Sequence, residues 1–394
     1  MALTKVSSKT LSDNAVTSDK IAAGAISVSD MADNSITAAK LHTSVQGALG
    51  TRNLVINGDM RIAQRGTSTT YQYANGYYTA DRWKMSVDNN WYSEFNIDVV
   101  TDVPDGQGFA KALKYSIGYN GGNGGGANLK IQQRIEGQNI QHLKKGTSNA
   151  ESLTLSFWVK SNKTGTYIAE LYDVDNTRSI SKSYTINAAD TWEKKTITYA
   201  GDTTGTFGND NNASLDVNLF LIAASAYTSG TLQTSWGTVT NANRAVGQVD
   251  FLDNNSNYYT ITGVQLEIGD TATPFEHRPY DMELARCQRY FQALGGVGGN
   301  DILAVGFGAG TDHYLGGKFN YPMRSQPTMG YIGTLSSINT TAPGISSGAT
   351  AIANVGGGII SFEIKTTGTS ISTGYACLVR TVGPGVYLTF DAEL

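Results

Sequence analysis

Three short segments place aromatic rings beside amide, hydroxyl or carboxylate side chains, the combination that binds sugars. Flat rings stack on the apolar faces of sugars, while polar side chains bond the hydroxyl groups. The candidate glycan contacts are Trp91, Tyr92, Tyr258, Tyr259, His313 and Tyr314. At each position the alternative is an aromatic residue that packs in the core or along a sheet, since Trp and Tyr usually bury much of their area.

No set of residues points to catalysis. The four histidines, at positions 42, 142, 277 and 313, are scattered and none lies in a metal-binding motif such as H-E-x-x-H. The glycine run Gly121–Gly126 lacks the strand, helix and lysine of a nucleotide site. We therefore expect no catalytic residue, metal or cofactor and no enzymatic activity. A pair of carboxylates brought together by the fold for sugar hydrolysis is the alternative. Asp173, Asp175 and Asn176 indicate a turn first and a calcium site second.

The composition indicates a turn-rich β protein. The 394 residues include 45 Gly and 21 Tyr, only 16% are charged, and the net charge is −4. This gives no electrostatic footprint for nucleic acid. No apolar run approaches the ~20 residues of a membrane span, and the first residues lack a signal-peptide core. Two cysteines, Cys287 and Cys377, cannot form a disulfide framework. We expect a chain made in a cytoplasm, without membrane insertion.

The first 50 residues carry a repeat of ten residues, seen four times, with an apolar residue at every fifth position. These positions are Val6, Leu11, Val16, Ile21, Ile26, Met31, Ile36 and Leu41. Neither one continuous helix nor one strand gathers this spacing on one face. The burial within a unit, about 4–6 kcal/mol, is less than the cost of ordering ten residues, roughly 10–20 kcal/mol.

Several identical chains that turn these apolar columns toward a shared axis would make up the difference. The repeat therefore predicts an oligomerisation shaft over residues 1–50. A disordered leader is the alternative, because the segment is poor in hydrophobic residues.

Residues 51–279 predict a β-sandwich, of the jelly-roll type. Alternating apolar residues separated by turn formers indicate strands with one buried face. The clearest strands are 153–159, 166–172, 195–199, 217–221 and 264–268. Many short strands without a long amphipathic helix favour a two-sheet architecture.

One helix is predicted over residues 280–296, where it links the sandwich to a small β-domain over 297–394. Asp281 is the expected N-cap, Leu284, Cys287, Phe291 and Leu294 form the apolar face, and Gly295-Gly296 ends the helix. Cys287 is interpreted as a small core residue. Arg286 and Arg289 are expected to pair with Glu276 or Glu283, and Arg324 is expected to be structural.

Several segments resemble phage tail-fibre, or receptor-binding fibre, proteins. Asn53–Gly66 with Asp81–Trp83 is similar to the opening of their body domain, and 264–269, 273–276 and 283–290 are similar to its closing segment. Residues 319–327 and the end Asp391–Leu394 resemble the distal tip, and the repeat resembles a fibre shaft. These pieces frame nearly the whole chain, although the middle of the sandwich is generic.

The resemblance implies a homotrimer in a virion, attached to other tail or capsid proteins through its N-terminus, with its distal end at the host surface. We expect a non-enzymatic fibre that binds a host surface glycan or receptor, with avidity from its copies. A glycan-degrading tailspike and a purely structural capsid fibre or adaptor are the alternatives.

Overall fold

The computed structural model describes residues 52–88, 92–122, 124–296, 301–309, 312–333, 335–339, 351–367 and 376–394. The chain divides into two compact units, residues 1–50 and 51–394. The first unit, with the ten-residue repeat and its eight apolar positions from Val6 to Leu41, lies outside the described residues. The shaft and its assembly into a trimer therefore stay predictions.

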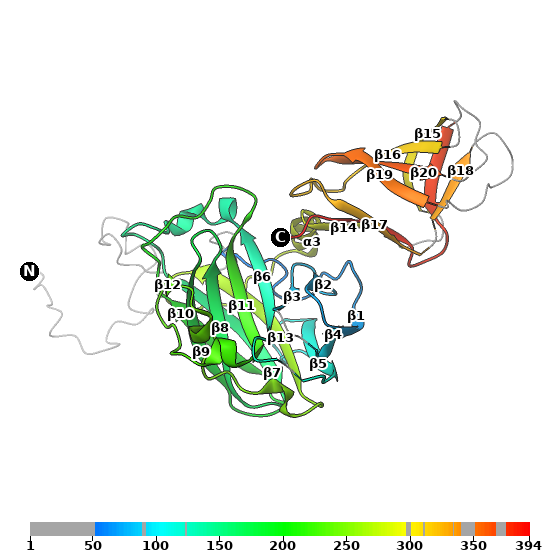
Figure 1. The fold of residues 1–394 in the computed structure, drawn as a ribbon. Helices are drawn as coiled ribbons and strands as arrows, with labels where there is room; N and C mark the ends of the chain where they lie inside the picture. The colour runs from blue at the N-terminus through cyan, green and yellow to red at the C-terminus, as the bar shows by residue number, and fades with distance from the viewer. Residues whose placement is uncertain are drawn as a thin grey trace, which may run out of the picture. The chain divides into compact units, whose positions relative to one another are not determined.

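Two antiparallel sheets form the sandwich (Figure 1). The first sheet has the order β1 (Ser68–Gln72), β4 (Glu94–Val100), β5 (Ala112–Tyr119), β13 (Tyr258–Ile268), β7 (Leu153–Ser161) and β10 (Glu193–Tyr199). The second has the order β12 (Gly237–Thr238), β9 (Arg178–Ile186), β8 (Gly165–Asp173), β11 (Ala213–Ala223), β6 (Asn128–Glu136), β3 (Lys84–Val87) and β2 (Gly76–Tyr77). In the first sheet, the last strand in sequence is β13. It lies between β5 and β7, so residues far apart in the sequence pair at the centre of this sheet.

Alternation of apolar residues explains how the two sheets pack. In β7, Leu155, Phe157 and Val159 are fully buried, and the ring of Phe157 lies 5.1 Å from that of Tyr184 in the second sheet, centroid to centroid. Burying each such side chain contributes about 1.5–3 kcal/mol. The five strands predicted most clearly fall within β7, β8, β10, β11 and β13. The mostly β, jelly-roll prediction is confirmed.

A second β-domain follows, built on two further sheets. One has the order β14 (Phe291–Gly295), β22 (Tyr387–Asp391) and β17 (Thr328–Ile332). The other has the order β18 (Leu335–Asn339), β21 (Ala376–Thr381), β15 (Ile302–Ala309), β16 (Asp312–Lys318), β20 (Ser361–Thr367) and β19 (Ala351–Gly357). Phe319, Phe362 and Phe390 form its centre, with ring centroids 4.5–5.4 Å apart.

The predicted linking helix is half wrong. The helix α3 spans Tyr280–Gln288, and its N-cap position is Pro279 instead of the expected Asp281, with no side-chain cap. Phe291 and Leu294, expected on its apolar face, belong to β14 and pair with Asp391 and Leu388 of β22. Strand pairing with the end of the chain overrides the local helical spacing, which sequence periodicity cannot detect. Cys287 is fully buried, as expected.

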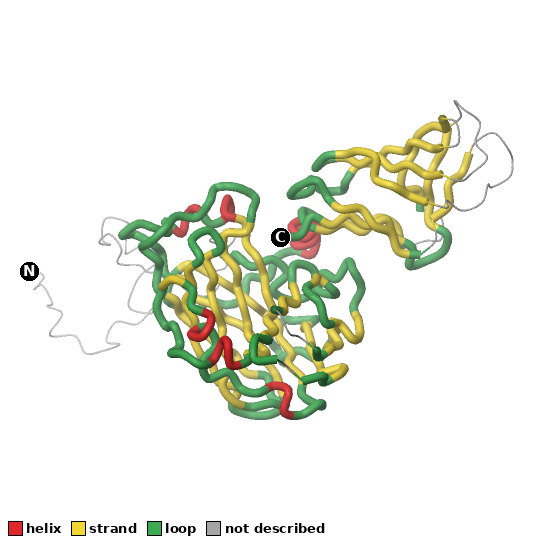
Figure 2. Tube along the Cα trace, in the orientation of Figure 1, coloured by secondary structure: helices red, strands yellow, loops and turns green. Residues whose placement is uncertain are grey.

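The other helices are short, and strands and loops make up most of the described chain (Figure 2). They are η4 (Gly137–Asn139), η5 (Gln141–Leu143), α2 (Ser225–Thr228), η6 (Asn241–Asn243) and η7 (Phe251–Asp253). Over the residues that the structure describes, no helix has the length and apolar character to cross a membrane.

Candidate functional site

The six candidate glycan contacts lie in different environments. Tyr259 and His313 are fully buried, and the hydroxyl groups of Tyr259 and Tyr184 lie 2.8 Å apart inside the sandwich. Both residues are therefore corrected from candidate contacts to core residues. Trp91 lies outside the described residues. Tyr92 is exposed, while Tyr258 and Tyr314 are half-buried on outer faces of their sheets.

Tyr258 already contacts neighbouring side chains on the outer face of the first sheet. Its hydroxyl donates a hydrogen bond to Oδ1 of Asp190 at 2.5 Å, and Nζ of Lys114 lies 4.7 Å from the ring centroid. Burial and the Asp190 carboxylate raise the pKa of the Tyr258 hydroxyl. A sugar would have to displace these contacts, so Tyr258 is a weaker candidate than Tyr92.

Exposed tyrosines gather at one end of the sandwich. Among the described residues of 52–279, four aromatic side chains have more than half of their surface exposed: Tyr71 (57%), Tyr73 (62%), Tyr92 (60%) and Tyr119 (58%). Single exposed aromatic residues need no explanation, but a cluster marks an interaction surface. We call Tyr71, Tyr92 and Tyr119 the tyrosine platform; Tyr73 adjoins it in the turn after β1.

Two glycines leave room for the tyrosines of the platform to approach β5. A Cβ placed on Gly118 would lie 3.2 Å from Cδ1 of the Tyr71 ring. A Cβ placed on Gly121 would lie 2.2 Å from the carbonyl oxygen of Tyr92 and 3.1 Å from Cε1 of Tyr119. Both glycines belong to the end of β5 and the segment that follows it, so this part of the chain lies against the Tyr71 ring, the Tyr92 backbone and the Tyr119 ring.

The backbone at Tyr71 is strained. Its φ is +56°, in the left-handed region, which is an outlier for a bulky side chain. The pairing register of β1 with β4 shifts between Thr69 and Gln72, so Tyr71 lies in a bulge. Bulges of this kind re-aim a side chain, and such strain gathers at functional sites. The Tyr71 N–H donates to Oδ1 of Asn96 at 3.2 Å, which holds the bulge.

Polar side chains border the rings. Glu94 and Asn96 are alternate residues of β4, and Glu94 pairs in register with Tyr119. Beyond Tyr119, the Asn120 amide donates to the carbonyl oxygen of Leu252 at 2.9 Å and to Oδ1 of Asn255 at 3.1 Å. Exposed rings beside amide and carboxylate oxygens are the chemistry of sugar binding.

A second aromatic surface lies on the C-terminal β-domain. The rings of Tyr314 and Phe307 stack with centroids 6.2 Å apart, and Phe307 is 57% exposed. They line a shallow groove of about 640 Å³ over β15, β16 and β20. The Lys365 ammonium pairs with Asp312 at 2.8 Å beside these rings. Tyr314 thus keeps an accessible face, unlike its neighbour His313.

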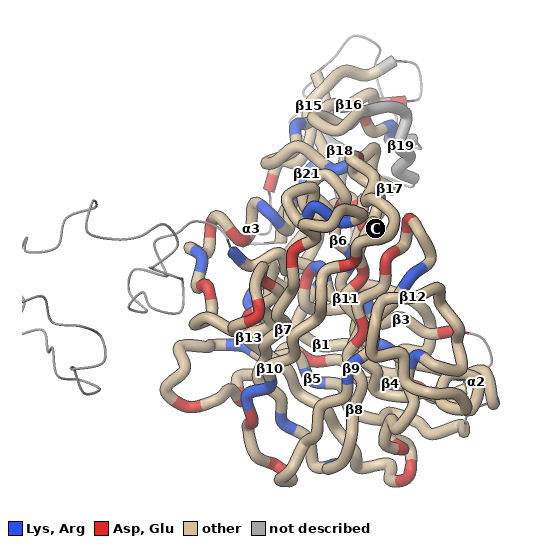
Figure 3. Tube along the Cα trace, turned by 90° about the vertical axis from the view of Figure 1, so that its left-hand side faces the viewer, with Lys and Arg blue, Asp and Glu red and all other residues tan. Residues whose placement is uncertain are grey.

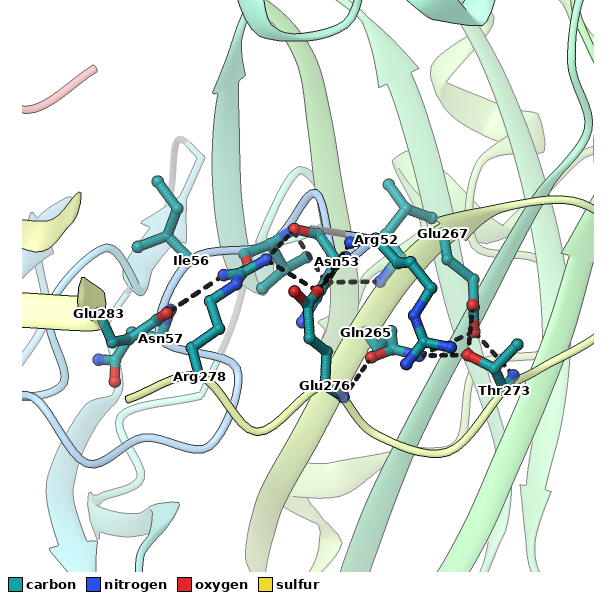
Figure 4. A network of polar contacts seen from close by, with 12 residues as sticks. Arg52, Asn53, Ile56, Asn57, Gln265, Glu267, Thr273, Glu276, Arg278 and Glu283 are labelled. Carbon is teal, nitrogen blue, oxygen red and sulfur yellow. Dashed lines mark hydrogen bonds and ion pairs between the residues drawn. The ribbon is translucent and has the colours of Figure 1, made fainter. Parts of the chain in front are cut away.

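The segments that resemble fibre proteins meet in a polar network, which we call the clasp (Figure 4). Arg278 pairs with Glu276 at 3.3 Å and with Glu283 at 3.2 Å, and it donates to the Val55 carbonyl at 3.1 Å. Glu276 accepts hydrogen bonds from the backbone N–H of Arg52 and Asn53 at 2.9 and 2.6 Å. The clasp fastens the first residues of the sandwich to the segment after β13, which is a structural role.

The arginines of α3 and beyond are paired differently from the prediction. Arg289 binds Glu136 of β6 in a bidentate pair at 2.8 and 2.8 Å, instead of Glu276 or Glu283. Arg286 makes no hydrogen bond or ion pair with any residue that the structure describes. Arg324 donates to the carbonyl oxygens of Ala392 and Asn211, both at 2.8 Å, and is structural as expected.

Cys287 and Asp173, two residues whose side chains could do chemistry, both lie in environments that favour a structural role. Burial raises the pKa of the Cys287 thiol well above its usual value, which disfavours a nucleophilic thiolate. Asp173 accepts a hydrogen bond from the Asn176 N–H at 3.1 Å and pairs with Lys145 at 2.6 Å, so this segment is the expected turn. In the described ranges, His, Cys, Asp and Glu form no group that could hold a metal ion.

Comparison with known proteins gives distant structural likenesses. No family model matches the chain, and no curated protein matches it. Tailspike protein 4 of bacteriophage CBA120 aligns over 55% of this chain and 21% of its own, at 15% identity and a TM-score of 0.29. The chain thus covers about a fifth of that tailspike domain.

Two carbohydrate-binding proteins align over their whole or nearly whole length. TmCBM61, in complex with beta-1,4-galactotriose, aligns over 56% of this chain and 100% of its own, at 11% identity and a TM-score of 0.28. A family 11 carbohydrate-binding module from Clostridium thermocellum aligns over 54% and 98%, at 9% identity and a TM-score of 0.26. Likeness at this level establishes no family for the chain.

Proposed function

We propose that this chain is a fibre protein of a virion that binds a glycan on the host surface through the tyrosine platform. The observation that carries the proposal is the platform itself: three exposed tyrosines from β1, from the segment before β4 and from the end of β5, the first of them on a strained backbone. A positive φ at a bulky, exposed side chain costs stability, and binding through the Tyr71 ring would offset that cost.

The platform suits a polysaccharide better than a small buried ligand. Its rings are open to solvent, with carboxylate and amide groups of Glu94 and Asn96 alongside. On such a surface the rings stack on the flat face of a sugar, and the polar groups bond the hydroxyl groups at its edge. A single contact of this kind is weak, and three identical chains side by side would raise the effective affinity by about 10²–10⁴.

The attachment to a virion and the trimer follow from the resemblance of the N-terminal repeat and the distal segments to phage fibres. In this proposal the repeat of residues 1–50 gathers three chains and joins other virion proteins, and residues 51–394 face the host. The chain holds the glycan without cleaving it.

Binding is tested with the purified full-length chain on an array of bacterial surface polysaccharides, followed by competition with virion adsorption to a strain that carries the strongest binder. We expect saturable binding and a block of adsorption by excess protein. Shortened polysaccharide chains after incubation would instead indicate a tailspike. Binding to no polysaccharide, with adsorption unaffected, would indicate a purely structural component.

A further inference from the structure

A polar cleft of about 440 Å³ lies beside α3, apart from the tyrosine platform. Its lining comes from the start of the sandwich, from the η4–η5 segment, from α3 and from the C-terminal β-domain. The side chains that matter here are Asn139, His142, Arg286, Arg289 and Tyr321. This volume falls in the range of about 300–1,000 Å³ that is typical of small-ligand sites.

The carboxylates nearest the cleft already have partners. Glu276 and Glu283 are held in the clasp by Arg278 (Figure 4). Glu136 is held by both hydrogen bonds from Arg289. Each of these acids is hydrogen-bonded by an arginine other than Arg286, so the Arg286 guanidinium has no carboxylate bonded to it.

The guanidinium of Arg286 has no carboxylate partner. It is half-buried in the last turn of α3 and forms no hydrogen bond or ion pair with the described part of the chain. Burial and the nearby Arg278 lower the pKa of the Arg286 guanidinium, and the charges of Glu283 and Glu276 oppose this shift only in part. A group of this kind gains from an added anion, because the donors of its planar fork are otherwise unused.

The other lining groups fit a sugar ring better than a bare anion. The side chains of Asn139 and His142 are exposed, and Tyr321 is 42% exposed. Amide, imidazole and phenol groups bond sugar hydroxyls, while a guanidinium fork matches the two oxygens of a carboxylate. We propose that the cleft beside α3 binds an acidic sugar, with its carboxylate on Arg286 and its hydroxyl groups on Asn139, His142 and Tyr321.

The test is a calorimetric titration of the full-length chain with D-glucuronate, with D-glucose as the neutral counterpart and inorganic phosphate as the bare anion. We expect glucuronate to bind, glucose to bind at least tenfold more weakly, and added salt to weaken glucuronate binding. The change Arg286→Gln should lower glucuronate affinity at least tenfold, as a charge-assisted pair is lost.

The matched control is Arg380→Gln, which removes a half-buried arginine of β21 and should leave glucuronate affinity unchanged. Because Arg286 makes no hydrogen bond or ion pair with the described part of the chain, its variant should unfold close to the wild-type temperature. Equal binding of glucose and glucuronate, stronger binding of phosphate, no binding of glucuronate at millimolar concentration, or an unchanged Arg286→Gln variant would overturn the proposal.

This site stands apart from the proposed platform. The double variant Tyr71→Ala/Tyr119→Ala should lose polysaccharide binding and keep glucuronate binding. Loss of glucuronate binding in that variant would contradict a separate cleft, whereas intact polysaccharide binding there would count against the platform alone.

Discussion

At the scale of single residues, the tyrosine platform depends on a backbone conformation that no sequence pattern predicts. The tyrosines between residues 71 and 78 are visible in the sequence, but the bulge that turns Tyr71 outward and the turn that brings Tyr119 beside it are not. Of the six residues selected from sequence, Tyr92 belongs to the platform, while Tyr259 and His313 are core residues. Aromatic residues next to asparagine occur in both settings, so only burial separates them.

The change Tyr71→Gly tests whether the strain serves binding. Glycine adopts a positive φ without a Cβ penalty, so the folded state should lose no more than about 1 kcal/mol of stability and could gain. The ring is lost, so polysaccharide affinity should fall about tenfold, the equivalent of roughly 1.4 kcal/mol. Urea unfolding and surface plasmon resonance measure the two effects. A stable variant with full affinity would show that Tyr71 takes no part in binding.

Asp81, in the segment that resembles a fibre body, should make stability depend on pH. Burial raises the pKa of its carboxyl from 3.8 to about 6, against the opposing charge of Arg65. The folded chain therefore binds a proton between about pH 4 and pH 6 that the unfolded chain does not, so this group destabilises the fold above pH 6 and ceases to do so near pH 4.

The change Asp81→Asn should remove this dependence. The unfolding free energy of the variant relative to wild type should rise by on the order of 2–3 kcal/mol from pH 4 to pH 7, measured by urea unfolding. The exposed Asp105→Asn serves as control and should show no such trend. A difference that stays constant across this pH range for Asp81→Asn would contradict the assignment.

At the scale of elements, sequence periodicity predicts strands well where one face is buried. In β7 the apolar residues Leu155, Phe157 and Val159 recur at every second position, and the strand lies where expected because only one register turns all three into the core. The segment after Gln288 was missed because its partner, β22, lies nearly a hundred residues away at the end of the chain. Pairing over that distance leaves no local signal.

The chain end is also tied to the sandwich, which gives an element-scale prediction. Glu393, just beyond β22, pairs with Arg82, whose side chain is 1% exposed and whose guanidinium carbon lies 3.4 Å from the centroid of the Tyr290 ring. Glu393→Ala leaves a buried guanidinium without its carboxylate, so it should destabilise residues 51–394 by about 3–5 kcal/mol in urea unfolding. The exposed Glu363→Ala in β20 should change stability by less than about 0.5 kcal/mol. Equal effects of the two changes would argue against this anchor.

At the scale of the whole molecule, charges of the two signs nearly balance, with 29 Lys and Arg against 33 Asp and Glu. Lysines and arginines are interspersed with aspartates and glutamates in the view of Figure 3. Recognition through rings and hydrogen bonds fits such a surface better than long-range steering does.

The proposed trimer makes a prediction about mass. Sedimentation equilibrium of the full-length chain should give three times the 42.0 kDa of one chain. A chain that begins at residue 51 should sediment as a smaller assembly, because the apolar columns of the repeat are then missing. A full-length chain that sediments as a single copy would contradict the role proposed for residues 1–50.

The most direct test of the platform compares polysaccharide affinity between matched tyrosine variants of the full-length chain. Surface plasmon resonance on the strongest array polysaccharide should show at least a tenfold loss for Tyr71→Ala/Tyr119→Ala, since exposed aromatic anchors carry most of such binding energy. Tyr280→Ala, which removes an equally exposed tyrosine from α3 (56%), should bind like wild type. Wild-type affinity in the double variant, or an equal loss in Tyr280→Ala, would contradict glycan binding by the platform.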